Sequence, residues 1–422
     1  MKKKLLTMLL CLGLLAVLFA GCAGDRSAPE PTAAPTEGPA AASTPEPETS
    51  PEAQEPASGE TDPAQAEEDY QAIVRQLLAA RGKIDPQTVI CTIDGQDVTW
   101  GEFFYFISGD LQDVIYYTGG LPVDYDEPLT DEASLGDYFR RSAQSQAVYY
   151  AVANSRAAEN GVTLSPETET AIEEYWSRLV ESYGGEEALR DAMEEARLNE
   201  DLLRFFLRSN ELLSALKDKL YGAGGERLSD EEVLSWGREN GYLRTKHILY
   251  YFYNEDGTPM DEEGKAAQKE RAEASLAELR ALAEDPQALE RRFDEIMKAD
   301  SGDGGGLTNF PDGYTFTTGN MTPNYEEASL ALEEYALSDV VETNYGYHII
   351  LRLPMTPEGL TMDQDSGTGA YMTLRESAAA ERFNLDLTGW INDAKVEWTD
   401  EKYENLDLTD LFDLTPEEKT GE

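Results

Sequence analysis

The sequence predicts a multidomain chain that combines a mainly α-helical part with a smaller α+β domain. A length of 422 residues suggests two or three domains, and 41% of the residues are apolar, enough for sizeable cores. Apolar residues recur at helical spacing over most of residues 63–240. Between Tyr242 and Leu353 the pattern changes to strand, helix, helix, glycine-rich loop, helix and strand, an order typical of a compact α+β domain.

The N-terminus has the features of an export signal. Three lysines follow Met1, and the apolar run from Leu5 to Ala20 has 16 residues, fewer than the roughly 20 that span a bilayer. We therefore interpret residues 1–21 as a signal peptide. Phe19-Ala-Gly-Cys22 resembles a lipobox, in which the cysteine after the cleavage site is acylated, and acyl chains on Cys22 would anchor the protein to a membrane. The alternative is an ordinary cleavage site with an incidental cysteine.

Residues 22–62 have the composition of a disordered tether. From Ala23 to Asp62 there is no Ile, Leu, Val, Phe, Tyr or Trp, while proline recurs among Ala, Thr, Ser and Glu. Such a segment has no apolar surface whose burial would offset its loss of conformational entropy. At about 3.1 Å per residue it would reach roughly 120 Å when fully extended. We expect it to hold the folded body away from the lipid.

Residues 63–240 are expected to form a helical domain that contains one early strand. The first helix starts near Pro63 and stops at Gly82, and residues 88–93 form a strand before the turn Asp94-Gly95. Thr99 is the expected N-cap of the next helix, with Glu102 as its capping-box partner. Periodicity predicts further helices over residues 138–159, 165–182, 186–196 and 199–221, and a last one from Ser229, which forms a capping box with Glu232.

The chain contains two histidines, and both lie in predicted strands of the α+β segment. His247 stands in Lys246-His-Ile-Leu-Tyr-Tyr-Phe252 and His348 in Tyr347-His-Ile-Ile-Leu351, runs rich in β-branched and aromatic residues. If these strands pair, residues of matching phase share a face, and we expect the imidazoles to meet within hydrogen-bonding reach. The segments between them are expected to be helices over 261–284, 286–298 and 324–334 and a glycine-rich loop over 301–306.

Four short motifs make this segment similar to the parvulin-type peptidyl-prolyl isomerases. The resemblance implies an α+β domain over residues 241–355, with a small antiparallel sheet flanked by helices. It also implies catalysis of X-Pro rotation without a cofactor, a metal or a nucleophile. The early strand, turn and helix around Thr99 resemble the start of the chaperone domain in extracytoplasmic foldases of the SurA and PrsA type. The four motifs are Lys246-His-Ile-Leu249, Gly319-Asn-Met-Thr-Pro-Asn-Tyr-Glu-Glu-Ala328, Leu337-Ser-Asp-Val-Val-Glu-Thr343 and Tyr345-Gly-Tyr-His-Ile-Ile350.

The resemblance also implies roles for individual residues. His247, His348 and Thr343 match the central hydrogen-bond network of the family. Met321 and Tyr325 match the apolar surface that holds proline, with tyrosine in place of the more usual phenylalanine. Asp303 stands where the family carries a cysteine or aspartate beside the substrate carbonyl, and Asp300 is the competing assignment. The loop departs from the pattern, because Gly304-Gly-Gly-Leu307 replaces the usual Gly-Gly-Asp-Leu-Gly.

The family further implies how the C-terminal segment is used. In these foldases the chain returns after the isomerase domain and completes the N-terminal domain. We therefore expect residues 356–422 to pack on the helices before Gly241 and the isomerase domain to be an insertion. Within this segment, residues 356–370 are predicted to be a loop, 371–393 a helix and 394–398 a strand.

Composition excludes several other classes of function. The chain has 83 acidic and 34 basic residues and a net charge of −49, which argues against binding of nucleic acid or of an anionic membrane surface by the protein itself. Cys11 and Cys22 belong to the N-terminal segment, so Cys91 stands alone and no internal disulfide framework is possible. With two histidines and one cysteine in the folded body, we expect no zinc site.

These observations favour a lipid-anchored foldase on the extracytoplasmic face of the cell membrane. It would isomerise X-Pro bonds and hold unfolded or proline-containing secreted polypeptides. A holdase with an inactive parvulin domain is the alternative, because the glycine loop is altered. A third hypothesis is a lipoprotein that serves as a scaffold for assembly. The sequence specifies neither the client proteins nor the oligomeric state.

Overall fold

The computed structural model describes residues 63–122, 124–130, 133–254, 256–365 and 368–413. These residues form two compact units. The first unit comprises residues 63–216 and 388–413, and the second comprises residues 217–387. The second unit is thus larger at both ends than the predicted domain 241–355. Among the described residues, no helix combines the length and hydropathy needed to cross a bilayer. The predicted signal peptide, the tether and Cys22 lie outside the described residues.

A three-stranded sheet in the first unit joins two distant parts of the chain. β1 (Val89–Ile93) and β2 (Gln96–Thr99) form a hairpin whose turn residues Asp94 and Gly95 have φ of 49° and 80°. Two positive φ values are typical of a type I′ turn, whose twist matches that of the strands. The other edge of β1 pairs with β11 (Val396–Trp398), also antiparallel. The predicted strand over residues 394–398 therefore exists, and it lies beside the first strand.

Helices make up most of the first unit, and the N-cap predicted at Thr99 is present. α3 (Trp100–Thr118) begins at Thr99, whose side chain accepts a hydrogen bond from the backbone N–H of Glu102. α3 packs against α4 (Leu135–Glu159), which starts at a capping box formed by Ser134 and Asp137. The other elements of this part of the chain are α2 (Pro63–Arg81), β3 (Pro128–Thr130), β4 (Ala133–Ser134), α5 (Pro166–Tyr183), α6 (Glu186–Glu195), α7 (Glu200–Tyr221), α14 (Glu401–Glu404) and α15 (Leu408–Phe412).

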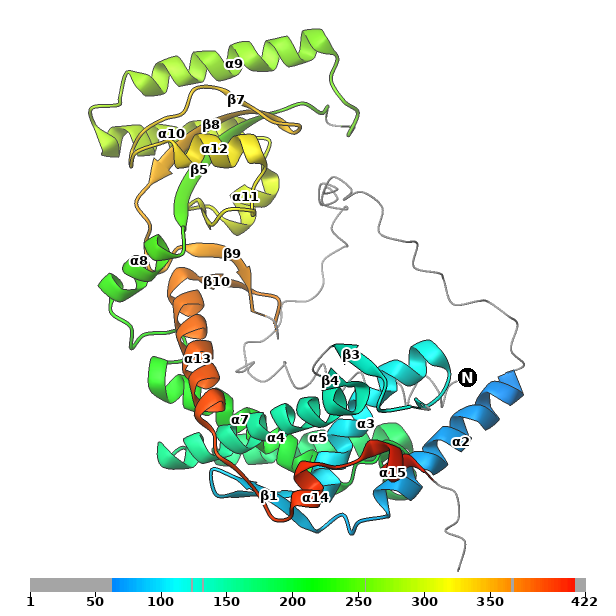
Figure 1. Ribbon diagram of the computed structural model, residues 1–422. Coiled ribbons are helices and arrows are strands. Elements are labelled where there is room, and N and C mark those ends of the chain that lie inside the picture. Colours follow the sequence, from blue (N-terminus) through cyan, green and yellow to red (C-terminus); the bar gives the residue numbers. More distant parts are fainter. Residues whose placement is uncertain (1–62, 123, 131–132, 255, 366–367, 414–422) are drawn as a thin grey trace, which may run out of the picture. The chain divides into compact units, whose positions relative to one another are not determined.

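The second unit is built on a six-stranded sheet of order β10-β9-β6-β5-β8-β7. Its centre is the antiparallel pair β5 and β8, which are joined over eight residue pairs. Figure 1 shows α9 and α10 on one side of this pair and α11 and α12 on the other. The bounds are β5 (Leu243–Tyr251), α9 (Glu262–Arg280), α10 (Pro286–Asp300), α11 (Gly304–Asn309), β6 (Tyr314–Phe316), α12 (Pro323–Leu330), β7 (Val341–Glu342), β8 (Gly346–Leu353), β9 (Leu360–Gln364) and β10 (Tyr371–Thr373).

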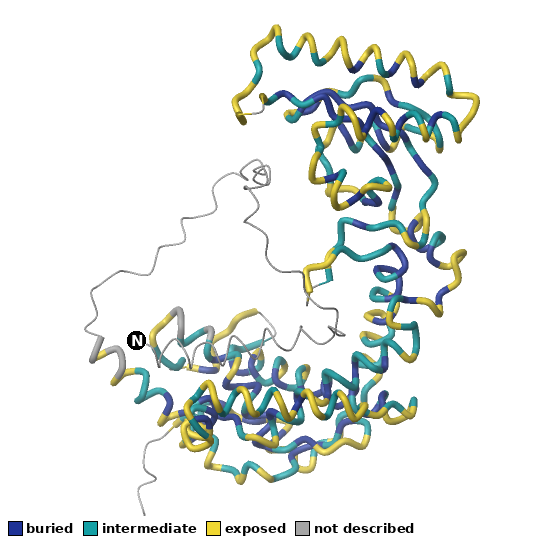
Figure 2. The backbone as a smooth tube through the Cα atoms, turned by 180° about the vertical axis from the view of Figure 1, so that it is seen from behind, coloured by how far each residue is buried: buried dark blue, intermediate teal, exposed yellow. Residues whose placement is uncertain are grey.

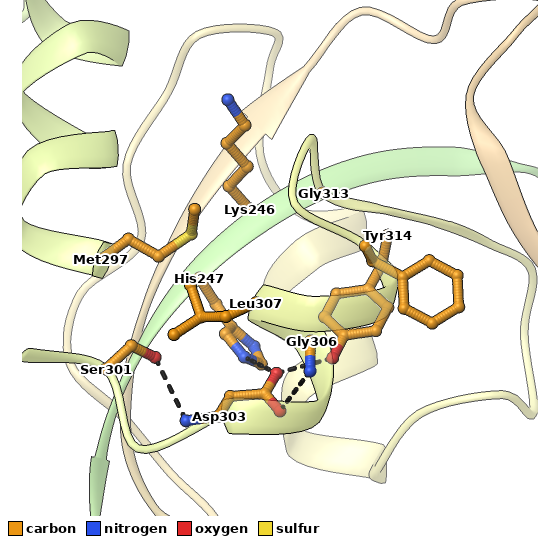
Figure 3. Close-up of a pocket in the computed structure, with 10 residues that line it drawn as sticks. Lys246, His247, Met297, Ser301, Asp303, Gly306, Leu307, Gly313 and Tyr314 are labelled. Carbon is orange, nitrogen blue, oxygen red and sulfur yellow. Dashed lines mark hydrogen bonds and ion pairs between the residues drawn. The ribbon is translucent and has the colours of Figure 1, made fainter. Parts of the chain in front are cut away.

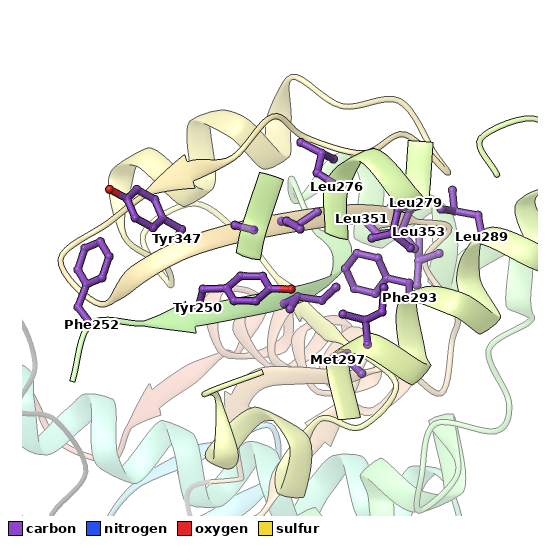
Figure 4. Close-up of a cluster of buried hydrophobic side chains, with 14 residues drawn as sticks. Tyr250, Phe252, Leu276, Leu279, Leu289, Phe293, Met297, Tyr347, Leu351 and Leu353 are labelled. Carbon is purple, nitrogen blue, oxygen red and sulfur yellow. The ribbon is translucent and has the colours of Figure 1, made fainter. Parts of the chain in front are cut away.

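Alternation along β5 and β8 separates the main core from the opposite face of the sheet. Ile248 and Tyr250 of β5 and Ile349 and Leu351 of β8 point toward α9 and α10, where they form a buried apolar cluster with both helices (Figure 4). In Figure 2 the two strands are buried along most of their length, whereas α9 is exposed along its outer side. The residues of opposite phase, His247 and His348 among them, face α12 and β6.

Two predictions for this unit were wrong. The glycine-rich loop is partly helical, because Asp303 caps α11 and accepts a hydrogen bond from the backbone N–H of Gly306. Residues 356–370, predicted to be a loop, contain β9, and Thr361 of this strand pairs in parallel with Thr315 of β6. The sheet is therefore mixed rather than antiparallel. β9 satisfies the backbone groups on the free edge of β6, a tertiary requirement that the Gly- and Asp-rich sequence of the segment does not reveal.

The segment after the sheet packs on a helix that precedes Gly241 in the sequence. α13 (Leu374–Asp393) buries Leu374, Ala378 and Ala379 against Val233 and Trp236 of α8 (Asp230–Glu239). The capping box predicted for α8, between its N-cap serine and the glutamate three residues later, is present. Both helices belong to the second unit, apart from the last turns of α13. Part of the C-terminal segment therefore extends the isomerase-like unit.

We predict that Glu102→Gln stabilises the first unit in a pH-dependent manner. Glu102 is 7% exposed, and burial raises its pKa to about 8, against the capping hydrogen bond from Thr99, which lowers it. The unfolded chain ionises this carboxyl near its ordinary pKa of about 4.3. Stability of the parent therefore falls as the pH rises from about 4.5 to 8, whereas glutamine keeps the cap without a charge. The variant should match the parent at pH 4.5 and exceed it by up to about 4 kcal/mol at pH 8.

Urea unfolding at both pH values, followed by circular dichroism, measures this difference. A gain that is the same at pH 4.5 and pH 8 would contradict a buried, neutral Glu102.

Candidate active site

The register of β5 and β8 places the two histidines on one face of the sheet. His247 pairs with Ile350 and His348 pairs with Leu249, so the histidines are diagonal neighbours. Their ring centroids are 5.0 Å apart, with an angle of 60° between the planes. The expected hydrogen bond between them is not formed, since each Nε2 is bonded elsewhere and, among the described residues, neither Nδ1 has a partner. Diagonal residues are farther apart than directly opposed ones, which explains the difference.

Asp303 is the acidic residue that the structure brings to the histidine pair. Its Oδ2 lies 2.8 Å from His247 Nε2 and accepts a hydrogen bond from Tyr314 Oη at 2.6 Å, while Oδ1 accepts one from the Gly306 N–H at 2.9 Å (Figure 3). The competing candidate, Asp300, instead forms an ion pair with Arg271 at 2.7 Å. The geometry therefore selects Asp303, as the motif spacing favoured.

The segment that carries Asp303 is attached to β5 by hydrogen bonds. The Gly302 N–H donates to the Leu249 carbonyl at 2.8 Å, and the Leu249 N–H donates to Ser301 Oγ at 3.1 Å. A Cβ atom at position 302 would lie 2.6 Å from Cβ of Tyr251, so only glycine permits this approach. These contacts fix the start of α11 beside His247.

The hydrogen bonds of Asp303 determine the protonation of its neighbours. Burial alone would raise the pKa of Asp303, but donation from His247, Tyr314 and Gly306 lowers it well below its ordinary value. An ionised carboxylate only accepts hydrogen bonds, so His247 carries a proton on Nε2. Burial and the charge of Asp303 raise the pKa of Tyr314, which therefore remains a hydroxyl donor.

His348 is buried and bonded to a threonine of the preceding strand connection. It is 4% exposed, and its Nε2 lies 2.8 Å from Thr343 Oγ1. Burial, together with the nearby His247, lowers the pKa of His348 to about 3, against the attraction of Asp303. Thr343 Oγ1 also accepts a hydrogen bond from the Tyr345 N–H at 3.1 Å, and the Gly346 carbonyl lies 3.5 Å from the same hydroxyl. At neutral pH His348 is thus an uncharged imidazole hydrogen-bonded through Nε2 to Thr343.

Tyr325 and Met321 lie on the same face of the sheet. Tyr325 is 2% exposed, and its ring meets both imidazoles edge to face, with centroids 5.3 Å and 5.4 Å away. Its hydroxyl has a partner, Thr245 Oγ1, at 2.8 Å. Met321 is half-buried and packs on the small apolar cluster that contains Tyr325. Tyr325 therefore packs against both imidazoles from within the domain, and Met321 is the more accessible part of the apolar surface.

Two residues of the site were missed from the sequence: Gly306 and Tyr314. Lys246, the first residue of the His247 motif, is buried, points to the face opposite His247 and pairs with Glu290 at 3.0 Å and Asp294 at 2.8 Å. Nothing in the local sequence signals that Tyr314 contributes, because its partner comes from another element. Gly306 lies in the glycine run that differs from the family pattern, and this departure was the available signal.

The cavity beside Asp303 is small. It is lined by His247, Asp303, Tyr314 and Phe310, among others, and measures about 10 Å³, which is about the space of one water molecule. A prolyl ring does not fit there. Within the described part of the chain, no three His, Cys, Asp or Glu side chains gather closely enough to hold a metal ion.

Comparison with known proteins identifies the segment that carries this site. Residues 247–353 match the family model described as Rotamase: PPIC-type PPIASE domain. Curated relatives include the foldase protein PrsA of Oceanobacillus iheyensis, 26% identical over 43% of this chain and 52% of that protein. PrsA of Staphylococcus aureus is 28% identical over 42% of this chain and 50% of that protein. The chain thus spans about half the length of the curated relatives that it matches.

Solved crystal structures of proteins named PrsA also align with this chain. The crystal structure of PrsA from Bacillus subtilis aligns with 64% of this chain and 92% of its own, at 17% identity and a TM-score of 0.24. That of PrsA from Lactococcus lactis covers 77% of this chain and 98% of its own, at 13% identity and a TM-score of 0.27. On the match of residues 247–353, the chain carries a parvulin-type peptidyl-prolyl isomerase domain.

We predict that His348 stays uncharged through the physiological pH range. Because the chain has two histidines, spectra of histidine-labelled protein contain two sets of imidazole signals. One set should not titrate between pH 8 and pH 5, since the pKa of His348 is lowered to about 3. The unfolded chain binds this proton near its ordinary pKa of about 6.5, so His348 makes stability fall as the pH drops from about 6.5 toward 3. Titration of both histidines near pH 6.5 in the folded protein would disprove the burial argument.

Proposed function

We propose that this chain is a lipid-anchored extracytoplasmic foldase that catalyses cis/trans isomerisation of X-Pro bonds and holds unfolded secreted polypeptides. One observation carries the proposal. His247 with Asp303 and His348 with Thr343 form two hydrogen-bonded pairs whose imidazole rings are in contact, inside the segment that matches the isomerase family. The motif assignments made from the sequence thus converge on one face of one sheet.

The reaction requires a site that favours a twisted amide. Rotation about a peptide bond has a barrier of about 18 to 20 kcal/mol from resonance, and for X-Pro the two isomers differ by about 1 kcal/mol or less. No bond to carbon forms or breaks, so no nucleophile is needed. Polar groups that are fixed in a dry surface and match the charge distribution of the twisted state lower the barrier without having to reorganise.

The cluster can supply such fixed polar groups. The Asp303 carboxylate accepts three hydrogen bonds, one of them from His247, whose side chain is 11% exposed. His348 is neutral and is hydrogen-bonded to Thr343. Each histidine is thus fixed by its own partner, and together they present an electrostatic surface to the amide without passing a proton to substrate. Met321, beside the buried Tyr325, offers the apolar contact for the prolyl ring.

In this proposal the N-terminal residues export the isomerase domain from the cytoplasm and anchor it to the membrane. Residues 1–21 would direct export, acylated Cys22 would anchor the protein, and residues 22–62 would serve as the tether. The helical part would bind unfolded clients, with the isomerase domain as an insertion within it. A net charge of −49 disfavours nucleic acid and anionic surfaces as partners, and the chemistry needs no cofactor.

The test of the activity is X-Pro exchange in a short peptide, measured by magnetisation-exchange NMR on the chain from residue 23 onward. We expect the parent to accelerate exchange, and His247→Ala and His348→Ala each to reduce the acceleration at least about tenfold, because each removes a fixed polar group of the site. Tyr250→Phe is the matched control. Its hydroxyl donates to Ser275 Oγ at 2.6 Å on the opposite face of the sheet.

Circular dichroism establishes that each variant is folded. No acceleration by a folded parent would overturn the enzymatic part of the proposal and leave a holdase as the better reading of the same fold.

We predict that Cys22→Ser releases the protein from the membrane. In this proposal acyl chains on Cys22 supply the attachment, and they contribute roughly 0.8 kcal/mol per buried methylene. Fractionation of cells that express each form should find the parent with membranes and the variant in the soluble extracytoplasmic fraction. Membrane retention of the variant at parent levels would contradict anchoring through Cys22.

A further inference from the structure

We propose that Tyr314 is a positioning residue of the isomerase site, whose hydroxyl fixes the Asp303 carboxylate and thereby the orientation and proton of His247; this role rests on the proposed function. The hydroxyl donates to Asp303 Oδ2 at 2.6 Å, and His247 Nε2 lies 2.8 Å from the same oxygen. One carboxylate oxygen therefore links the tyrosine to the histidine. Removal of the tyrosine hydroxyl would change the partner on which the His247 proton depends.

The register between β6 and β5 explains how Tyr314 reaches the Asp303 carboxylate. β6 pairs with β5 so that Tyr314 stands opposite Thr245. Directly opposed residues of an antiparallel pair point to the same face, and Thr245 is two residues before His247, so all three side chains share that face. The rings of Tyr314 and His247 are in contact, with centroids 5.6 Å apart. The pairing of β6 with β5 thus places the Tyr314 side chain at the site.

Gly306 provides the space for this hydrogen bond. A Cβ atom at position 306 would lie 2.1 Å from Asp303 Oδ2 and 2.2 Å from Tyr314 Oη, distances at which one of the two groups must move. The same glycine donates its N–H to Asp303 Oδ1. The altered glycine run, which differs from the family pattern, is therefore complementary to the tyrosine hydroxyl.

Residues beyond the family-matched segment support the tyrosine ring. Phe310 packs on Tyr314 with centroids 4.7 Å apart, and Tyr371 of β10 packs on Phe310 at 4.6 Å. β9, which pairs with β6, and β10 both follow residue 353, where the match ends. Strands added to the parvulin-type sheet thus hold β6 and its tyrosine in place.

Loss of the hydroxyl should affect the charge of the site. Asp303 is 22% exposed, and it would retain two of its three donors. Fewer donors to a carboxylate raise its pKa, so Asp303 would take up a proton at a higher pH than in the parent. The titratable groups that surround this pair are His348 on β8, Tyr314 on β6, Tyr325 on α12 and, on β5, Lys246, which is paired with Glu290 and Asp294 of α10.

The test compares Tyr314→Phe with the parent in the chain from residue 23 onward, labelled with ¹⁵N-histidine. Phenylalanine keeps the ring contacts and removes the hydroxyl alone. We expect the His247 imidazole signals to shift, those of His348 to stay nearly unchanged, and X-Pro exchange to slow about tenfold, the usual effect of losing a hydrogen bond to a charged group. Tyr250→Phe, the control, should change neither the signals nor the rate of exchange.

A double-mutant cycle with Asp303→Asn identifies the route of the effect. If Tyr314 acts through Asp303, Tyr314→Phe should slow exchange less than about twofold in the asparagine background. Undisturbed His247 signals in Tyr314→Phe, or a full additional loss in the double variant, would overturn the inference. The imidazole signals can be measured without isomerase activity. A parent that does not catalyse exchange would therefore refute the proposed function, while the His247 signals would still show whether Tyr314 positions His247.

Discussion

The antiparallel pairing of β5 with β8 is the constraint on which the rest of the second unit depends. Because side chains alternate, one register assigns Ile248, Tyr250, Ile349 and Leu351 to the core under α9 and α10, and the same register assigns both histidines to the other face. A shift of one residue would expose the core and bury the histidines against the helices. Stability and site geometry are therefore two consequences of one ladder.

The site itself depends on keeping one buried carboxylate satisfied. An ionised group taken out of water is costly unless donors replace its hydration, and Asp303 has three donors from three different segments. This arrangement explains several residues at once. Gly302 permits the approach to β5, Gly306 leaves room for the tyrosine hydroxyl, and the carboxylate in turn places the proton of His247 on Nε2. The glycine run that departs from the family pattern is thus consistent with an ordered site.

The sheet extends past the segment that the family model matches. β9 lies along β6 and β10 along β9, so the connection between the isomerase-like segment and α13 is part of the fold that supports Tyr314. α13 then packs on α8 at the other end of this unit. The functional unit is accordingly broader than residues 241–355, and changes in the connecting strands can reach the site through Phe310 and Tyr371.

The sequence by itself determined the local features: helix starts at Thr99 and Ser229 and the strands around His247 and His348. Its motifs proposed roles for Thr343, Met321 and Tyr325 and left Asp303 and Asp300 as alternatives. Such features depend on caps, alternation and spacing, which act over a few residues. Only the tertiary structure decided that the imidazoles are diagonal rather than hydrogen-bonded, that β9 joins the sheet, and that Tyr314 and Gly306 complete the carboxylate site. These outcomes depend on the register between segments far apart in the chain, and no local pattern encodes which distant backbone or side chain will satisfy a buried group.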